Sequence, residues 1–358
     1  MAKKKLKTCK HCGAEIAATA KTCPQCGGKN KAPIYKRPWF VVLVVLIIIG
    51  IIAGGSGSKK NQDTHKVGEV TNNTSSQETT NNTSEEEPTV EKKTSYVVGD
   101  ILQDGDIKIV YIASGNYVED NQFLQPGENN QYVFLKFAFI NEGKTDKSVS
   151  FYNFDAYADG YACDMHYSSD EALSATLSAG RATSGTIVFE VPKNAQDIEV
   201  EYSPNAFSSK KVKFVFEGEK DSGYVLEPNT SRTEGAYHVG DVIEDKNVII
   251  IYMACELYTS DNQFIQPKSG YHFETVTLEF ENTGTSDKHV STLSFDCYAD
   301  GVACDQMFAR EDDLSGTISA GRKIKGTVTF EVPDNAEVVE VEYNDNIWTS
   351  HRIVFTVK

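Results

Sequence analysis

The stretch VFLKFAF, residues 133–139, decides the fold class of most of the chain, because its apolar residues recur at every second position. These alternating residues are Val133, Leu135, Phe137 and Phe139. A period of two places such side chains on one face of a β-strand. Further strand candidates lie at residues 107–113, 149–158, 161–165, 183–191, 197–202 and 211–216, with turn residues between them. The pattern predicts an antiparallel β-sandwich.

The predicted sandwich occurs twice, because the same motifs return 141 residues later without a gap. The repeated segments include Tyr96-Val-Val-Gly-Asp100 with Tyr237-His-Val-Gly-Asp241, Tyr157-Ala-Asp-Gly160 with Tyr298-Ala-Asp-Gly301, Ser178-Ala-Gly-Arg181 with Ser319-Ala-Gly-Arg322, and Phe189-Glu-Val-Pro192 with Phe330-Glu-Val-Pro333. Self-similarity at a fixed period is typical of a repeated domain. We therefore expect two sandwiches, at residues 96–217 and 237–358, joined by a linker at residues 218–236.

The net charge of -16 is distributed very unevenly along the chain. Residues 1–38 hold ten Lys or Arg and one acid, Glu15, whereas residues 39–55 hold no charged side chain. Residues 56–358 hold 25 basic and 50 acidic residues. A basic head, an apolar segment and an acidic body are typical of a single-pass membrane topology.

The apolar segment at residues 39–55 is predicted to be the transmembrane helix, since 17 helical residues extend about 26 Å, close to the bilayer core. The positive-inside rule places residues 1–38 in the cytoplasm and residues 56–358 outside the cell. A cleaved signal peptide is the disfavoured alternative, because the preceding segment is long. Residues 56–95 are rich in Ser, Thr, Asn and Glu, so we expect a disordered stalk.

The head contains two Cys-x-x-Cys pairs, formed by Cys9, Cys12, Cys23 and Cys26. Four thiolates at this spacing can converge tetrahedrally on one structural Zn²⁺ ion and leave no open position for catalysis. A pair of redox-active dithiols is the alternative. The segment from Thr8 to Gly28 resembles the short zinc-ribbon domains at the N-termini of many bacterial membrane proteins.

The other four cysteines lie in the predicted sandwiches. If Asp300-Gly301 forms a two-residue hairpin turn, Cys297 faces Cys304 across the two strands, within disulfide range. In the first repeat Ala156 stands in place of Cys297. We therefore predict a possible disulfide between Cys297 and Cys304. The alternative is that these two, together with Cys163 and Cys255, are reduced and packed as small hydrophobic residues.

No catalytic motif is present: the sequence has no Gly-x-Ser-x-Gly elbow, no His-Glu-x-x-His helix and no phosphate-binding loop. We expect no enzymatic activity.

Carboxylates near the two predicted hairpins could bind Ca²⁺ through oxygen ligands. These are Asp155, Asp159, Asp164, Asp296, Asp300 and Asp305. Acidic residues on a solvent-exposed face explain the same pattern, and we favour that explanation over a Ca²⁺ site.

Two loops with the sequence Asp-Asn-Gln-Phe are identical in both repeats and are candidate binding loops. Their first and last residues are Asp120 and Phe123 in one repeat and Asp261 and Phe264 in the other. An exposed Phe in a polar loop can anchor a partner, whereas a Phe folded back into the core would be structural. Phe207 and Trp348, at equivalent positions, allow the same two interpretations. The acidic repeats disfavour binding to nucleic acid.

The motifs of the two repeats, taken in their order along the chain and including Asn141-x-Gly143 and the Phe-Glu-Val-Pro segments, resemble a bacterial extracellular domain family of unknown function. That family has an immunoglobulin-like β-sandwich related to a secreted immunoprotective antigen. The resemblance implies an all-β class with two tandem immunoglobulin-like antiparallel sandwiches, and it implies export, but no activity.

Together these patterns predict a membrane-anchored protein that binds an extracellular protein or envelope component. The alternative is a signalling or envelope-stress protein that reports external binding to a cytoplasmic partner through the zinc ribbon.

Overall fold

The computed structural model describes residues 6–8, 15–17, 65–69, 95–167, 172–204, 211–308, 312–344 and 351–358. The chain divides into two compact units, Met1–Asn61 and Gln62–Lys358. In the first unit, β1 (Leu6–Thr8) pairs antiparallel with β2 (Glu15–Ala17). The described residues contain no helix that is both long and apolar enough to cross a bilayer. The predicted span at residues 39–55 lies outside them.

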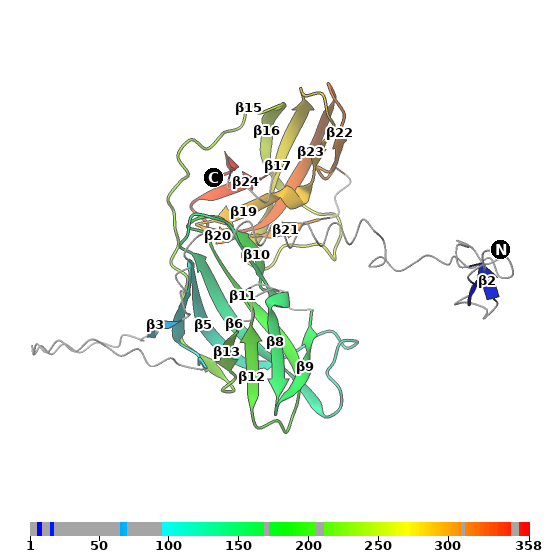
Figure 1. Ribbon diagram of the computed structural model, residues 1–358. Coiled ribbons are helices and arrows are strands. Elements are labelled where there is room, and N and C mark those ends of the chain that lie inside the picture. Colours follow the sequence, from blue (N-terminus) through cyan, green and yellow to red (C-terminus); the bar gives the residue numbers. More distant parts are fainter. Residues whose placement is uncertain are drawn as a thin grey trace, which may run out of the picture. The chain divides into compact units, whose positions relative to one another are not determined.

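The first repeat is a β-sandwich of two antiparallel sheets (Figure 1). One sheet has the order β4 (Asp100–Asp104), β5 (Ile107–Tyr117), β6 (Asn130–Asn141) and β11 (Ala182–Pro192). The other contains β8 (Phe154–Ala158), β12 (Ile198–Tyr202) and β13 (Val212–Val215). Strand β9 (Tyr161–His166) pairs with β8 at its start and with β11 at its end, so it joins the two sheets. Strands β7 (Lys147–Ser150) and β10 (Ser174–Leu177) form a small separate pair.

The alternation predicted for residues 133–139 is confirmed. Val133, Leu135, Phe137 and Phe139 are fully buried between the two sheets. The opposite face of this sheet is also covered. There Ala138 of β6 and Val110 and Ile112 of β5 form a second apolar cluster, against which Tyr224 and Leu226 pack. The predicted linker therefore lies along the first sandwich at these residues and explains why both faces of β6 contain apolar side chains.

The second repeat has the same two-sheet arrangement. One sheet has the order β15 (Val242–Asp245), β16 (Val248–Tyr258), β17 (Tyr271–Asn282), β23 (Lys323–Pro333) and β21 (Asp305–Met307). The other contains β20 (Val302–Ala303), β19 (Phe295–Ala299), β24 (Val339–Tyr343) and β25 (Ile353–Thr356). Strands β18 (Lys288–Val290) and β22 (Gly316–Ile318) form the small pair.

The repeated polar motifs hold turns in both copies. The buried Asn141 amide donates to the carbonyl oxygens of Thr145 and Leu177, and Asn282 makes the equivalent bonds. The hairpin residues Asp159 and Gly160 have φ angles of 50° and 82°, the left-handed conformation that a two-residue hairpin turn requires. The motifs that the repeats share are therefore explained largely by backbone geometry.

The prediction of a stalk without structure is wrong at one segment. Strand β3 (His65–Glu69) pairs antiparallel with β4, with His65 opposite Gln103 and Glu69 opposite Asp100. The pairing uses backbone groups, which an edge strand such as β4 offers to any extended segment. A composition low in apolar residues therefore did not exclude a strand here. Most of the predicted stalk lies outside the described residues.

The two sandwiches are joined by a buried ion cluster. Arg181 follows the tight turn before β11, and its guanidinium lies 2.6 Å from Glu340 and 2.9 Å from Glu342 on β24. The side chains of Arg181 and Glu340 are 7% and 0% exposed. Burial alone would raise the pKa of Glu340, but hydrogen bonds from Arg181 and Thr233 hold it below its usual range.

Other contacts extend this junction. The Arg181 guanidinium lies over the ring of Tyr298, 4.7 Å from its centroid. The Tyr298 hydroxyl donates to the carbonyl oxygen of Thr176 in the first repeat. In the backbone, the amide of Ala182 donates to the carbonyl oxygen of Gly301 at 2.9 Å, so β11 of the first repeat pairs in parallel with β20 of the second. Arg322, which is equivalent to Arg181, is exposed.

We predict that Arg181→Met destabilises the tandem by about 3–5 kcal/mol, because it leaves Glu340 buried without its cation. Arg322→Met is the matched control and should change the free energy of unfolding by less than about 0.5 kcal/mol. Chemical denaturation of residues 62–358 measures both changes. Equal effects of the two substitutions would contradict the role assigned to the cluster.

Candidate binding loops and the cleft between the repeats

The two Asp-Asn-Gln-Phe loops project their Phe side chains into solvent. Phe123, between β5 and β6, is 84% exposed, and Phe264, between β16 and β17, is 86% exposed. Asp120 and Asp261 are exposed beside them. Neither Phe is folded back into a core, so the structural alternative for these loops does not hold.

The same hydrogen bonds shape both loops. In the first loop the Asn121 side chain accepts from the backbone amide of Phe123, and the Gln125 side chain donates to the carbonyl oxygens of Glu119 and Asn121. The second loop repeats this set with Asn262, Phe264, Gln266 and Ser260. These hydrogen bonds close each loop onto its own backbone while its Phe stays uncovered.

A glutamate of the Phe-Glu-Val-Pro motif anchors the far end of each loop. Glu190 accepts from the Gly127 amide at 2.9 Å and from the Asn130 side chain at 2.8 Å. These hydrogen bonds hold the pKa of Glu190 below its usual range. Glu331 accepts from the Lys268 amide in the second repeat. Sequence reasoning missed both anchors, although their repetition at the same offset was the available signal.

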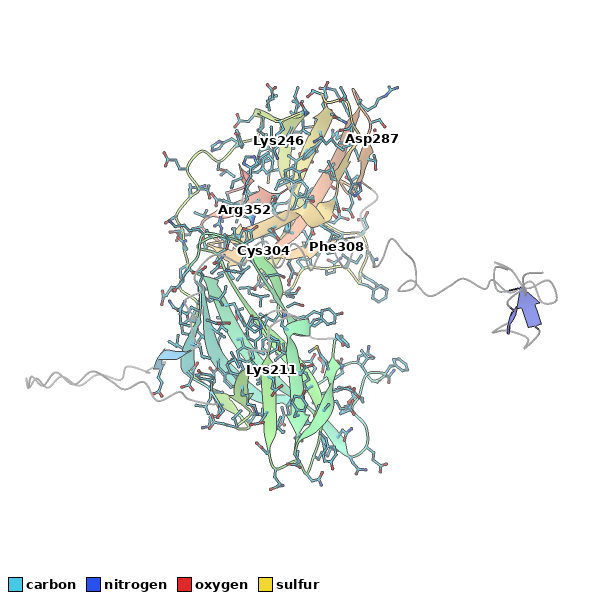
Figure 2. The ribbon with its side chains drawn as sticks, in the orientation of Figure 1. Lys211, Lys246, Asp287, Cys304, Phe308 and Arg352 are labelled. Carbon is cyan, nitrogen blue, oxygen red and sulfur yellow. The ribbon has the colours of Figure 1, made fainter. Side chains whose placement is uncertain are left out.

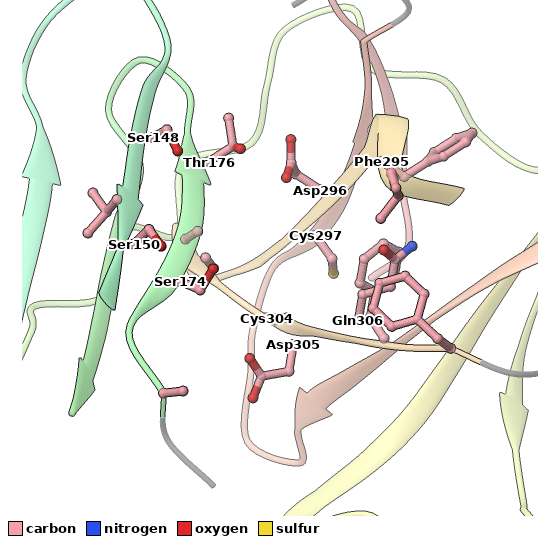
Figure 3. A pocket seen from close by; sticks show the side chains of 17 residues that line it. Ser148, Ser150, Ser174, Thr176, Phe295, Asp296, Cys297, Cys304, Asp305 and Gln306 are labelled. Carbon is pink, nitrogen blue, oxygen red and sulfur yellow. The ribbon is translucent and has the colours of Figure 1, made fainter. Parts of the chain in front are cut away.

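A second candidate site is a cleft of about 590 Å³ between the repeats. One wall is formed by β7 and β10, with the hydroxyls of Ser150 and Thr176 among its lining groups. The other wall contains Asp296 and Cys297 of β19 and residues of β21 (Figure 3). The aromatic ring of Phe308 lines the cleft as well, in the part of the second repeat that also contains Cys304 (Figure 2). Sequence reasoning could not locate this cleft, because its two walls come from different repeats.

Asp296 is the unusual titratable group of this cleft. Its pKa is raised to about 7, chiefly by burial and to a smaller extent by the carboxylates of Glu342 and Asp146, against the opposing effect of Arg352. Glu342 lies directly opposite Asp296 in the pairing of β19 with β24. The equivalent residue of the first repeat, Asp155, is exposed. Only the second repeat therefore has a partly buried carboxyl group at this position.

The predicted hairpin register around Asp300-Gly301 is confirmed. Tyr298 pairs with Ala303 and Ala299 with Val302, and the amide of Cys304 donates to the carbonyl oxygen of Cys297. The four cysteines of the sandwiches are nevertheless free thiols in this structure, so the predicted bridge is not formed in it. Burial raises the pKa of the Cys297 thiol, which keeps it protonated at neutral pH.

The candidate Ca²⁺ ligands do not converge. Among the described residues, no group of three or more His, Cys, Asp or Glu side chains is arranged to hold a metal ion. Asp159 and Asp300 instead accept hydrogen bonds from the backbone amides of Asp197 and Val338. Their place in the repeated hairpins is explained by this fixing of the adjacent turn.

The remaining predicted site residues lie outside the described residues. They are the zinc ligands Cys9, Cys12, Cys23 and Cys26, and the aromatic residues Phe207 and Trp348.

Family models match most of the chain. The model of a domain of unknown function, DUF4352, matches residues 96–212 and 237–353, about two thirds of the chain. The model of a zinc-ribbon domain matches residues 8–29. No curated protein matches the chain.

Several solved structures are similar to about one third of the chain, the length of one sandwich. The yjhA protein of Bacillus subtilis is 12% identical over 34% of this chain and 99% of its own, with a TM-score of 0.28. An uncharacterised β-sandwich protein of Clostridium difficile is 14% identical over 37% of this chain and 100% of its own, with a TM-score of 0.25. The secreted protein MPT63 of Mycobacterium tuberculosis is 13% identical over 35% of this chain and 99% of its own, with a TM-score of 0.26.

We predict that oxidising conditions join Cys297 to Cys304, because opposed strand residues lie within disulfide range. Intact mass after alkylation without reductant should then show two modified thiols in residues 62–358. In the Cys304→Ser variant, Cys297 has no partner, so three thiols should be alkylated. Four alkylated thiols in the wild type after oxidation would rule the bridge out.

Proposed function

Since the chain belongs to the DUF4352 domain family, we propose that it is a binding protein, not an enzyme, whose tandem sandwiches contact a protein or envelope component outside the cell. The observation that carries this proposal is the pair of identical loops with exposed Phe side chains. A loop whose backbone is already closed by hydrogen bonds loses little entropy when its exposed Phe enters a pocket of a partner.

The partner should combine apolar pockets with a cationic or neutral rim. Exposed carboxylates at Asp120 and Asp261 accompany the two Phe side chains, and residues 56–358 hold twice as many acids as bases. This charge repels nucleic acid and other anionic polymers. Two copies of the same contact would also raise the overall affinity for a repetitive surface.

The proposal includes a single-pass membrane anchor at residues 39–55. Support comes from the uncharged segment and from the excess of Lys and Arg before it. The zinc ribbon would lie in the cytoplasm and the sandwiches outside the cell.

The ribbon is proposed to bind one structural Zn²⁺ ion through Cys9, Cys12, Cys23 and Cys26. The family match at residues 8–29 and the set of four thiolates support this assignment. Bound zinc would hold this short segment in a folded conformation, because a domain of this size has too small a core to fold alone.

We expect the double variant Phe123→Ser, Phe264→Ser of residues 62–358 to lose capture of native cell-envelope preparations. Each single variant should lose about thirtyfold in affinity or more, because central aromatic contacts contribute about 2 kcal/mol or more. Tyr161→Ser is the control, since Tyr161 is 80% exposed but lies outside the loops. Undiminished capture by the double variant would refute the proposal.

Metal analysis of the full chain should give one zinc ion per molecule. Cys9→Ser should lower this content sharply, because three thiolates bind zinc less tightly than four. Cys163→Ser, which changes a sandwich cysteine, should leave it unchanged. A wild-type chain that is free of zinc after expression with the metal present would contradict the assignment.

The membrane topology can be tested with tags at both termini. In spheroplasts, an impermeant protease should remove a C-terminal tag and leave an N-terminal tag intact, because only the sandwiches face outwards. Removal of the N-terminal tag without lysis would contradict the proposed orientation.

A further inference from the structure

The cleft between the repeats is a cavity that the proposed envelope contact does not use. Its volume of about 590 Å³ falls within the range of pockets for small molecules. The cleft exists only in the tandem, because β7 and β10 of the first repeat form one wall and β19 and β21 of the second form the other.

The groups that line the cleft favour a positively charged ligand. Its ionisable carboxyl groups are Asp296 and Asp305, and none of its described lining residues is Lys, Arg or His. Asp305 already pairs with Lys268, whose ammonium group lies 2.8 Å away. The Asp296 side chain forms no hydrogen bond or salt bridge within the described part of the chain and projects towards the cleft (Figure 3).

The surroundings of Asp296 lack a matching cation. Arg352 lowers the Asp296 pKa, but it already pairs with Asp146 and Glu342. Glu342 lies opposite Asp296 on β24. An arriving cation would therefore find a carboxyl group whose ionised form the protein itself does not satisfy, and binding would relieve the repulsion among the three carboxylates.

The remaining lining groups are suited to an organic cation. The hydroxyls of Ser150 and Thr176 can accept hydrogen bonds from an ammonium group, and the ring of Phe308 can contact alkyl carbons or the cation itself. A bare metal ion is disfavoured, since no group of three ligating side chains is arranged for one in the described residues.

We propose that the cleft between the repeats binds a small organic molecule that carries an ammonium group, with Asp296 as its counter-ion. Ser150, Thr176 and Phe308 would complete the site. The binding event joins both repeats, so it would also stabilise their junction.

Calorimetric titration of the full chain with cadaverine tests the proposal, with 1,5-pentanediol as the neutral probe of the same length. At pH 8 cadaverine should bind and pentanediol should not. Asp296→Asn should weaken cadaverine binding by about tenfold or more, the equivalent of one charge-assisted hydrogen bond. Asp155→Asn, at the equivalent exposed position, should have no effect.

The pH dependence supplies a second measurement. Since the Asp296 pKa is about 7, lowering the pH from 8 to 5 should weaken binding to about the level of Asp296→Asn, because the carboxyl group becomes protonated. Equal binding of cadaverine to wild type and Asp296→Asn, or equal binding of the neutral diol, would overturn the proposal.

A folding control separates loss of the site from loss of structure. The unliganded chain should lose stability as pH rises from about 4 to about 7, because ionisation of a carboxyl group with a raised pKa is unfavourable in the folded state. Asp296→Asn should remove this loss and remain folded. The double Phe variant should retain cadaverine binding, so failure of the envelope contact and failure of this site can be distinguished.

Discussion

The buried contact of Arg181 with Glu340 and Glu342 is the interaction on which the arrangement of the two sandwiches depends. The three charged groups are almost fully removed from water, so each is stable only while the others are present. The same cluster places Tyr298 and the β19–β20 hairpin against β10 of the first repeat. The cleft with Asp296 lies at this junction.

The duplicated motifs divide into those that act in both repeats and those that act once. Asn282 makes the same contacts in the second copy as Asn141 makes in the first, and Glu331 likewise corresponds to Glu190. Arg181 is buried, whereas Arg322 is exposed. Residues with identical sequence surroundings therefore have different energetic roles, since only one end of each sandwich meets the other.

The Phe loops illustrate how local sequence can encode a surface feature. Asn121 and Gln125 close the first loop onto its own backbone, and no core residue is required for that closure. A repeated polar loop that satisfies its own hydrogen bonds can keep an aromatic side chain exposed at little conformational cost. The strands and the hairpin turns were predictable for this reason, because each depends on periodicity or on contacts between near neighbours, whereas the sequence left open whether the two Phe side chains are exposed.

The sequence by itself determined the duplication, the strand periodicity, the Asp-Gly hairpins and the uneven distribution of charge. It could not place Arg181 beside Glu340, since those residues are far apart in the chain and their repeat equivalents do not meet. It also failed for β3, whose pairing uses backbone groups that composition does not describe. Only the tertiary structure decided which of two equivalent carboxyl groups, Asp155 or Asp296, is withdrawn from solvent. The physical reason is that burial and neighbouring charge depend on the packing of one repeat against the other, which no local pattern encodes.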